Sequence, residues 1–169
     1  KMHGGFFCAW TRQTTQASGD RTTQTKYELS DELSTIDWWA LANIMAAANL
    51  FERKAFDIAR AFHGSYASVF VHKGDELGAA ARAMSDRVYY ATVFDVVVAT
   101  EHQKCGVGRL LMEGLLAKLP FKRVFLTSVF GKEDFYAKFG FLRQTNAMGL
   151  YEGPALTSAV QRGILQANA

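Results

Sequence analysis

The chain has 169 residues, of which 49% are apolar and 21% are charged, and its formal net charge is +3. These values are typical of one globular domain with a sizeable core. They do not fit the concentrated Lys/Arg surface of a nucleic-acid-binding protein, and no apolar run approaches the ~20 residues that a membrane span needs.

Residues 1–25 form a polar lead-in, and residues 11–25 are rich in Thr, Gln, Ser and Arg. No clear secretory signal is present, and the first residue is a lysine. A linker, a remnant of a targeting segment and added sequence all remain open, so we assign residues 1–25 only as an N-terminal extension. Cys8 and Cys105 lie far apart, which favours two free thiols in a reducing compartment. We expect a cytoplasmic protein, with organellar targeting left open.

A short strand at residues 26–29 and two helices come first. Ser34 is the predicted N-cap of the first helix, with Asp37 as its capping-box partner. Apolar residues at helical spacing then run from Ile36 to Leu50. The second helix spans about residues 53–62 and ends near Gly64.

Three strands are predicted next, at residues 67–72, 77–84 and 88–99, because β-branched and aromatic residues alternate with turn segments. The loop at residues 103–108 leads into a helix with Val107, Leu110, Leu111 and Leu115 on one face. Pro120 ends that helix.

The last part of the chain predicts a strand at residues 124–129, a short helix at 132–139 closed by Gly140, and two final strands at 141–146 and 148–152. The order β-α-α-β-β-β-α-β-α-β-β predicts an α/β (α+β) fold, in which a mixed sheet is covered by helices. We assign residues 26–155 to a single domain and residues 156–169 to a C-terminal tail.

The loop and helix start at residues 103–109 have the chemistry of a phosphate site. A helix start offers unpaired backbone N–H groups, and glycine lets the backbone approach an anion closely. The Walker ending G-K-[ST] and the dinucleotide pattern G-x-G-x-x-G are both absent, and a tight turn into a helix is the alternative interpretation. The segment consists of Gln103, Lys104, Cys105, Gly106, Val107, Gly108 and Arg109.

Three features occur together: the spacing Gln-x-x-Gly-x-Gly, the apolar strand Asp95-Val96-Val97-Val98 before it, and Phe135-Tyr136-Ala137-Lys138-Phe139-Gly140-Phe141 after the next strand. This set resembles the GNAT superfamily of acyl-CoA N-acyltransferases over about residues 67–151. In that family the first motif grips the pyrophosphate of coenzyme A, and F-Y-x-x-x-G-F is the second hallmark. Residues 91–98, Gln103 and residues 111–113 are also similar to the branch of serotonin N-acetyltransferases, which points to aromatic or alkyl amines.

The resemblance implies a mostly antiparallel sheet of six to seven strands with a central splayed parallel pair, flanked by about four helices. The pantetheine arm of acetyl-CoA would lie between residues 93–99 and 124–129, and no metal is expected. The expected coenzyme A contacts are Val96, Val97, Val98, Gln103, Lys104, Cys105, Gly106, Val107, Gly108, Arg109, Ser128 and Phe135.

The expected catalytic residues are Tyr136 and Asp95. Tyr136 matches the tyrosine of the second hallmark, where it would protonate the leaving thiolate, and packing under its helix is the alternative. The backbone N–H of Val98 would stabilise the oxyanion. Asp95 is an acid within an apolar strand, so it either relays the proton of the amine or bonds a helix or loop and fixes the fold. Glu76 and Asp86 are lesser candidates for the base.

His102 and Cys105 do not carry a metal site by themselves, because a metal needs more ligands than two. The same pair is set aside as a Cys–His nucleophile, since both residues fall in the expected phosphate loop. Aromatic residues gather in the two early helices, where they form either a floor for an aromatic acceptor or ordinary core. They are Trp38, Trp39, Phe51, Phe56 and Phe62.

The expected function is transfer of acetyl from acetyl-CoA to a primary amine of a small molecule, such as an arylalkylamine, by direct attack in a ternary complex. A protein-lysine acetyltransferase and a non-catalytic acyl-CoA-binding sensor remain alternatives. The expected partner is the small-molecule amine, with no nucleic acid and no membrane, and a homodimer is left open.

Overall fold

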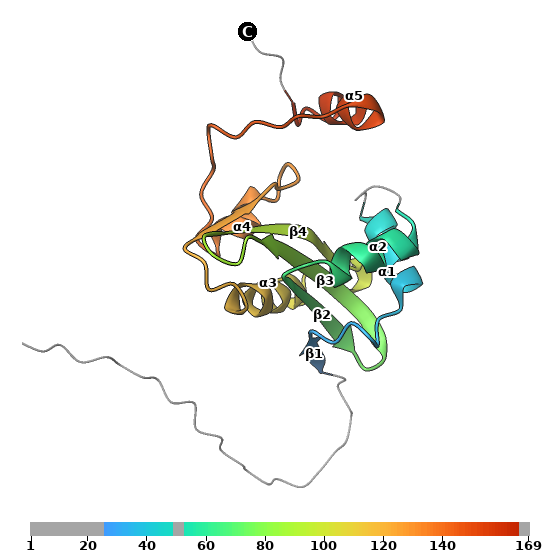
Figure 1. Cartoon of the computed structure of the whole chain (residues 1–169). Helices are drawn as coiled ribbons and strands as arrows, with labels where there is room; N and C mark the ends of the chain where they lie inside the picture. The colour runs from blue at the N-terminus through green and yellow to red at the C-terminus, as the bar shows by residue number, and fades with distance from the viewer. Residues whose placement is uncertain (1–25, 49–52, 166–169) are drawn as a thin grey trace, which may run out of the picture.

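A computed structural model of the chain describes residues 26–48 and 53–165 (Figure 1). The described part holds one five-stranded sheet and five α-helices. The strands are β1 (Tyr27–Ser30), β2 (Ala67–Lys73), β3 (Glu76–Ser85), β4 (Tyr90–Val98) and β5 (Arg123–Leu126). The helices are α1 (Trp38–Ala47), α2 (Ala55–His63), α3 (Val107–Ala117), α4 (Glu133–Ala137) and α5 (Gly153–Gln161), and a 3₁₀ turn, η1 (Thr100–His102), follows β4. No described helix has the length and apolar character needed to cross a membrane.

The strands lie in the sheet in the order in which they follow along the chain. Neighbours from β1 to β4 are antiparallel, and β4 and β5 are parallel, with α3 in the crossover between them. The expected mixed sheet is therefore confirmed, but it has five strands rather than six to seven. The parallel pair lies at the edge of the sheet and not at its centre, because no described strand follows β5.

The core has two layers, one on each face of the sheet. Val69 and Val71 of β2 face α3, and Phe70 between them faces α1 and α2, as strand alternation requires. Figure 1 shows α3 on one side of the sheet and the α1–α2 pair on the other. All three of these β2 side chains are fully buried, so the middle of the sheet is covered on both faces.

Alanines in β3 let both helix layers approach the sheet closely. Ala79, Ala81 and Ala83 are fully buried beneath α3, and Ala80 is buried beneath α1 and α2. Side chains of this size keep the backbone of α3 near the backbone of β3. The start of α3 is thus held against the central strands of the sheet.

The two final strands predicted at residues 141–146 and 148–152 are wrong, because the structure has no strand in either segment. Leu142, Met148 and Leu150 are each about nine-tenths exposed. A strand is stable only when it pairs with a neighbour and buries one face, and these segments do neither. The apolar residues of these segments alternate as they do in a strand, but no described strand lies beside them to pair with.

Two other predictions change at the ends of helices. Ser34 does not cap α1: the N-cap is Asp37, whose Oδ1 accepts the N–H groups of Trp39 and Ala40 at 2.9 and 3.1 Å. Asp is as good an N-cap as Ser, and it lies directly before the helical residues. Helix α5 is absent from the predicted elements. It begins with Gly153 and Pro154, and proline is favoured in the first turn of a helix. Residues 1–25, Leu50 and Phe51 lie outside the described residues.

Candidate active site

The parallel pair splits where β4 continues beyond β5. The two strands pair from Tyr90 with Arg123 to Val93 with Leu126, while β4 runs on to Val98. Residues 94–98 therefore have no described partner on the β5 side, and their backbone groups on that side are open to a ligand. The resemblance implied two diverging strands with the second at residues 124–129, whereas in the structure β5 ends at Leu126 and β4 extends past it.

Val98 directs its backbone groups into the split. Ala99 donates its N–H to the carbonyl oxygen of Gly78 at 2.9 Å, and Val98 lies opposite Ala79. Because hydrogen-bonded and non-bonded pairs alternate along an antiparallel ladder, the N–H and C=O of Val98 point away from β3. The carbonyl accepts the side-chain amide of Gln103 at 3.1 Å. The side chain of Val97 is buried among α1 and α2, so only its backbone is near the split.

A β-bulge bends β4 at Asp95. Asp95 and Val96 together oppose Ala81 of β3, and the register shifts between Ala80 and Arg82. Asp95 has a φ of +53°, in the left-handed region, which bulges use and which Asp tolerates better than most residues. Because of the bulge, the last residues of β4 depart from the direction in which β4 and β5 pair.

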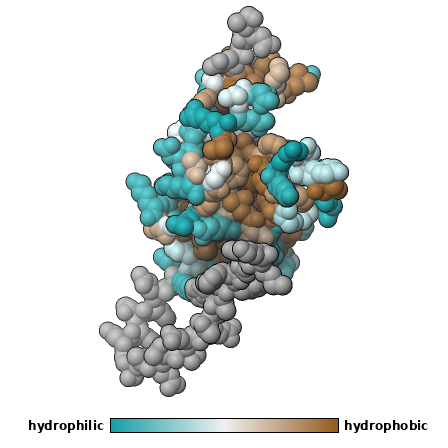
Figure 2. All heavy atoms as spheres, turned by 90° about the vertical axis from the view of Figure 1, so that its left-hand side faces the viewer, coloured by the Kyte–Doolittle hydropathy of each residue, from teal (hydrophilic) through white to brown (hydrophobic). Residues whose placement is uncertain are grey.

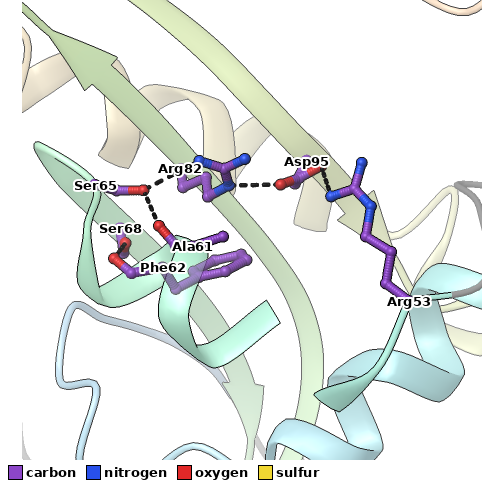
Figure 3. Close-up of polar contacts among 7 residues, drawn as sticks. All are labelled: Arg53, Ala61, Phe62, Ser65, Ser68, Arg82 and Asp95. Carbon is purple, nitrogen blue, oxygen red and sulfur yellow. Dashed lines mark hydrogen bonds and ion pairs between the residues drawn. The ribbon is translucent and has the colours of Figure 1, made fainter. Parts of the chain in front are cut away.

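The Asp95 carboxylate binds two arginines (Figure 3). Arg82 Nε lies 2.5 Å from Oδ2 and Arg53 Nη1 lies 2.9 Å from Oδ1. The Asp95 side chain is only 7% exposed, and Arg82 is 13% exposed. Arg82 also donates to Ser65 Oγ at 3.3 Å and lies over the ring of Phe94 at 5.2 Å. Each carboxylate oxygen thus ties the bulge to another segment, through Arg82 of β3 on one side and through Arg53, two residues before α2, on the other.

The lesser candidates for a general base are also engaged. The carboxylate of Asp86 accepts the backbone N–H groups of Val88, Tyr89 and Tyr90 at 2.8–3.0 Å. The bonds from Tyr90 and Val88 hold the pKa of Asp86 below its ordinary value. Glu76 lies at the start of β3, and its Oε1 is 3.3 Å from His102 Nε2.

The loop between η1 and α3 presents uncapped amides. Lys104 and Gly106 have φ values of +61° and +82°, and Gly106 is the N-cap of α3. No side chain caps this helix, and the first intrahelical bond runs from Leu110 N–H to the carbonyl of Gly106 at 3.0 Å. The N–H groups of residues 107–109 are therefore the unpaired donors of the helix start, where an anion is favoured. The Val107 side chain is buried in the core, so it offers only its backbone.

Val98, Gly108 and Phe135 meet at the start of α3. A Cβ placed on Gly108 would lie 3.4 Å from two ring atoms of Phe135 and 3.6 Å from Val98 Cγ2. Three predicted cofactor contacts from β4, α3 and α4 are thus brought together. These are ordinary van der Waals distances, so the ring of Phe135 packs directly on the first turn of α3, and a side chain larger than that of alanine would meet it.

The cations and the thiol of the loop face solvent. Arg109 is exposed and its Nε binds Glu113 Oε1 at 2.7 Å, a hydrogen bond that raises the pKa of Arg109. Lys104 is exposed, and the thiol of Cys105 donates to the carbonyl of Gln103 at 3.3 Å. The two cations therefore lie at the rim of the loop, outside the unpaired backbone amides of the helix start.

Tyr136 lies half-buried on α4. Its ring packs against Phe135 and Phe141, with centroid distances of 5.1 and 6.2 Å. Burial raises the pKa of the Tyr136 hydroxyl, because the phenolate would lose solvation. Within the described part of the chain, the Tyr136 hydroxyl makes no hydrogen bond to a side chain or to the backbone.

Tyr136 and Ser128 line one cavity of about 570 Å³. It lies between β5, α4 and the segment that follows α4, and its other large apolar lining residues are Phe125, Leu126, Phe130, Phe141, Leu142 and Ile164. Figure 2 shows hydrophobic side chains gathered in the middle of one face of the molecule, bordered by hydrophilic ones. A mostly apolar cavity with a phenol on its wall suits an organic ligand better than a free ion.

The sequence did not identify the two arginine partners of Asp95. A signal for Arg82 existed, because it is the only charged residue between Leu77 and Met84 and a buried strand charge needs a partner. Arg53 had no such signal, since it precedes Asp95 by 42 residues and approaches it only in the folded chain.

Comparison with known proteins gives one family over the central part of the chain. Residues 64–143 match the model of the acetyltransferase (GNAT) domain. The uncharacterized N-acetyltransferase ycf52 of Porphyra purpurea is 30% identical over 92 residues, which are 51% of this chain and 53% of that protein. The chain thus spans about half the length of the curated relatives it matches.

Solved structures show the same fold at low identity. A protein of the GNAT family from Xanthomonas campestris pv. campestris has a TM-score of 0.68 and 23% identity, over 79% of this chain and 97% of that one. The ribosomal-protein-S18-alanine N-acetyltransferase of Escherichia coli has a TM-score of 0.62 and 23% identity, over 71% and 80% of the two chains.

Proposed function

We propose that this chain, whose residues 64–143 match the model of the acetyltransferase (GNAT) domain, transfers an acetyl group from acetyl-CoA to a primary amine. The observation that carries the proposal is the open side of β4 beside the uncapped start of α3. The open side of β4 supplies extended backbone N–H and C=O groups, and the start of α3 supplies backbone N–H groups for an anion. A pantetheine arm ending in a pyrophosphate needs both in this arrangement.

The residues present fit coenzyme A. The N–H groups of residues 107–109 would hold the pyrophosphate, and the backbone at Gly106 is uncovered, since a Cβ there would meet nothing within 4 Å. Val96 and Val98 would bond the amides of the pantetheine arm through their backbone. Acetyl-CoA supplies the activated acyl group, and the chain binds and orients it.

Tyr136 is the proposed proton donor. Its raised pKa keeps the hydroxyl protonated at neutral pH, so it can give its proton to a departing thiolate. The N–H of Val98, which points into the split, is the proposed donor to the oxyanion. Within the described residues, neither the Tyr136 hydroxyl nor the Val98 N–H is taken by a hydrogen bond.

Asp95 is assigned to positioning rather than to proton transfer. Both of its oxygens bind guanidinium groups, and the pairs run toward α2 and β3. A carboxylate fixed in this way holds the bulge in its left-handed conformation and thereby sets the direction of the residues up to Val98. The proton of the amine would then leave to water.

The acceptor is proposed to be a small molecule with a primary amine. Of the early aromatic residues, Phe62 is buried and stacks with Phe70, and the partly buried Trp38 packs against both rings, at centroid distances of 5.5–6.2 Å, whereas Trp39 and Phe56 are exposed. The stacked residues favour the core interpretation over an aromatic floor. The apolar cavity beside Tyr136 is the stronger candidate for an organic acceptor.

The test is thiol release from acetyl-CoA in the presence of an amine panel that includes arylalkylamines, polyamines and peptides with a free lysine or N-terminus. We expect turnover with a free amine, and calorimetric binding of coenzyme A in its absence. Turnover with peptides alone would replace the small-molecule acceptor by a protein. Binding without any turnover would favour a sensor, and no binding at millimolar coenzyme A would refute the whole proposal.

A further inference from the structure

Two carboxylates and one histidine meet where the β2–β3 hairpin contacts η1. Glu76 begins β3, and Glu101 and His102 belong to η1, which directly precedes the loop at residues 103–106. One ligand atom from each of the three residues lies within 4.8 Å of the other two. The contact of the hairpin with η1 therefore assembles a set of side chains that are 25 residues apart in the chain.

His102 is the buried member of this set and has an unused nitrogen. The residue is only 4% exposed, and among the described residues its Nε2 has no hydrogen-bond partner. Glu76 Oε1 lies 3.3 Å from Nε2, which is ion-pair range, but the geometry does not make a hydrogen bond. A buried polar nitrogen without a partner is costly, so its presence needs a reason.

The rest of the surroundings hold the imidazole in place. Nδ1 lies 3.0 Å from the hydroxyl oxygen of Tyr27, and the two rings are nearly perpendicular. Gly78 gives the ring its space, because a Cβ there would lie 2.9 Å from His102 Cδ2. In the tautomer that carries its proton on Nδ1 and donates it to the Tyr27 oxygen, the lone pair of Nε2 faces the two carboxylates, which is the usual arrangement of a metal-binding histidine.

The distances suit a small divalent ion. Two ligands at about 2.0–2.1 Å from a tetrahedral ion are roughly 3.3–3.4 Å apart, which is the separation of Nε2 and Glu76 Oε1. Glu76 and Glu101 are exposed, so their side chains can close the remaining distance by changing rotamer. Two carboxylates also balance the charge of a divalent ion.

We propose that Glu76, Glu101 and His102 bind one divalent transition-metal ion, with Zn²⁺ as the best fit and water completing the coordination. An imidazole with carboxylates suits Zn²⁺ and its neighbours, whereas Ca²⁺ and Mg²⁺ prefer oxygen ligands only. The ion would link the β2–β3 hairpin to the turn before the loop, as a structural site. This site departs from the expectation of no metal, and it does not depend on acetyl transfer.

The test uses the full chain after treatment with a chelator, titrated by calorimetry with ZnCl₂. We expect one site per chain, and at least a ~10-fold loss of affinity in Glu76→Gln and in Glu101→Gln. Asp75→Asn is the matched control, because it removes the same charge from the neighbouring exposed residue of the same hairpin and leaves the three ligands intact. Its affinity should equal that of the wild type.

A second measurement uses Co²⁺ as a spectroscopic probe. Bound Co²⁺ should give visible d–d absorption in the wild type and in Asp75→Asn, and this absorption should be lost in Glu101→Gln, an exposed change that leaves the core unaltered. Zn²⁺ should likewise raise the Tm of the wild type and of the control but not of Glu101→Gln. Failure of the wild type to bind either ion, or equal binding by all variants, would overturn the proposal.

Discussion

Replacing Asp95 by Asn isolates the charge that holds the bulge of β4. Asn keeps the size of the side chain and tolerates the left-handed conformation, so the φ of +53° adds no new strain. What is lost is the negative charge between Arg82, which is 13% exposed, and Arg53, which is 37% exposed. The variant therefore tests the ion pairs and little else.

The magnitude follows from the burial of the two pairs. Breaking a buried pair costs about 3–5 kcal/mol, and the amide oxygen of Asn restores about 1 kcal/mol by accepting one hydrogen bond. The half-exposed Arg53 pair adds less than about 1 kcal/mol. We expect Asp95→Asn to lower the free energy of unfolding by roughly 3 kcal/mol, which in a domain of this size lowers Tm by about 10 °C.

The assay is urea unfolding, with Asp57→Asn as the matched control. Asp57 pairs with Arg60 at 4.0 Å, and both side chains are mostly exposed, so the control should stay within about 0.5 kcal/mol of the wild type. If acetyl transfer is established, the pH profile of kcat/KM should keep its shape in Asp95→Asn while its height falls. A stability within about 0.5 kcal/mol of the wild type would contradict the positioning role, and loss of the acidic limb of the profile would make Asp95 the base.

The remaining predictions concern three other residues. Tyr136→Phe should lower kcat by roughly 10²-fold or more while calorimetry shows unchanged coenzyme A binding; unchanged kcat would remove Tyr136 from the chemistry. Gly108→Val should weaken coenzyme A binding at least ~10-fold, because the added side chain meets Phe135, whereas Ala117→Val, a change to the same residue type at the exposed last residue of α3, should bind normally. Equal binding by both would argue against a cofactor at the start of α3. Because the folded pKa of Asp86 is depressed, its stabilising contribution is present above the unfolded value near 3.8 and is lost as the pH falls through the lowered one. Unfolding curves of wild type and Asp86→Ala should therefore differ at pH 7 and converge in acid; a difference that persists there would contradict the backbone hydrogen bonds as the cause.

Much of the fold could be predicted because its signals are local. The turn residues at 73–76 and 85–87 and the alternation around them gave β2, β3 and the start of the sheet to within a few residues. The glycine loop before α3 was found for the same reason, since helix starts carry their own chemistry. The parallel pairing of β4 and β5 came from the family resemblance rather than from the residues.

What could not be predicted depends on contacts between distant segments. Residues 141–152 have the alternation of strands but no neighbour to pair with, and sequence alone does not show whether a neighbour exists. Arg53 reaches Asp95, and Glu76 reaches His102, only after the chain has folded. Spacing along the sequence offers His102 only Cys105 as a second ligand, whereas in the folded chain ligand atoms of Glu76 and Glu101 lie within 4.8 Å of an imidazole nitrogen.

The alanines of β3 also set the distance between the sheet and α3 beside the proposed active site. Ala79, Ala81 and Ala83 lie under α3, and Val107 at the start of that helix belongs to the same buried cluster. A bulkier side chain at any of these three positions would lift α3 from the sheet and carry its first amides with it. Substitutions at these three alanines, none of which is a proposed ligand contact, should therefore change the affinity for coenzyme A that we propose, and variation among relatives at these positions is a place to look for differences in cofactor affinity.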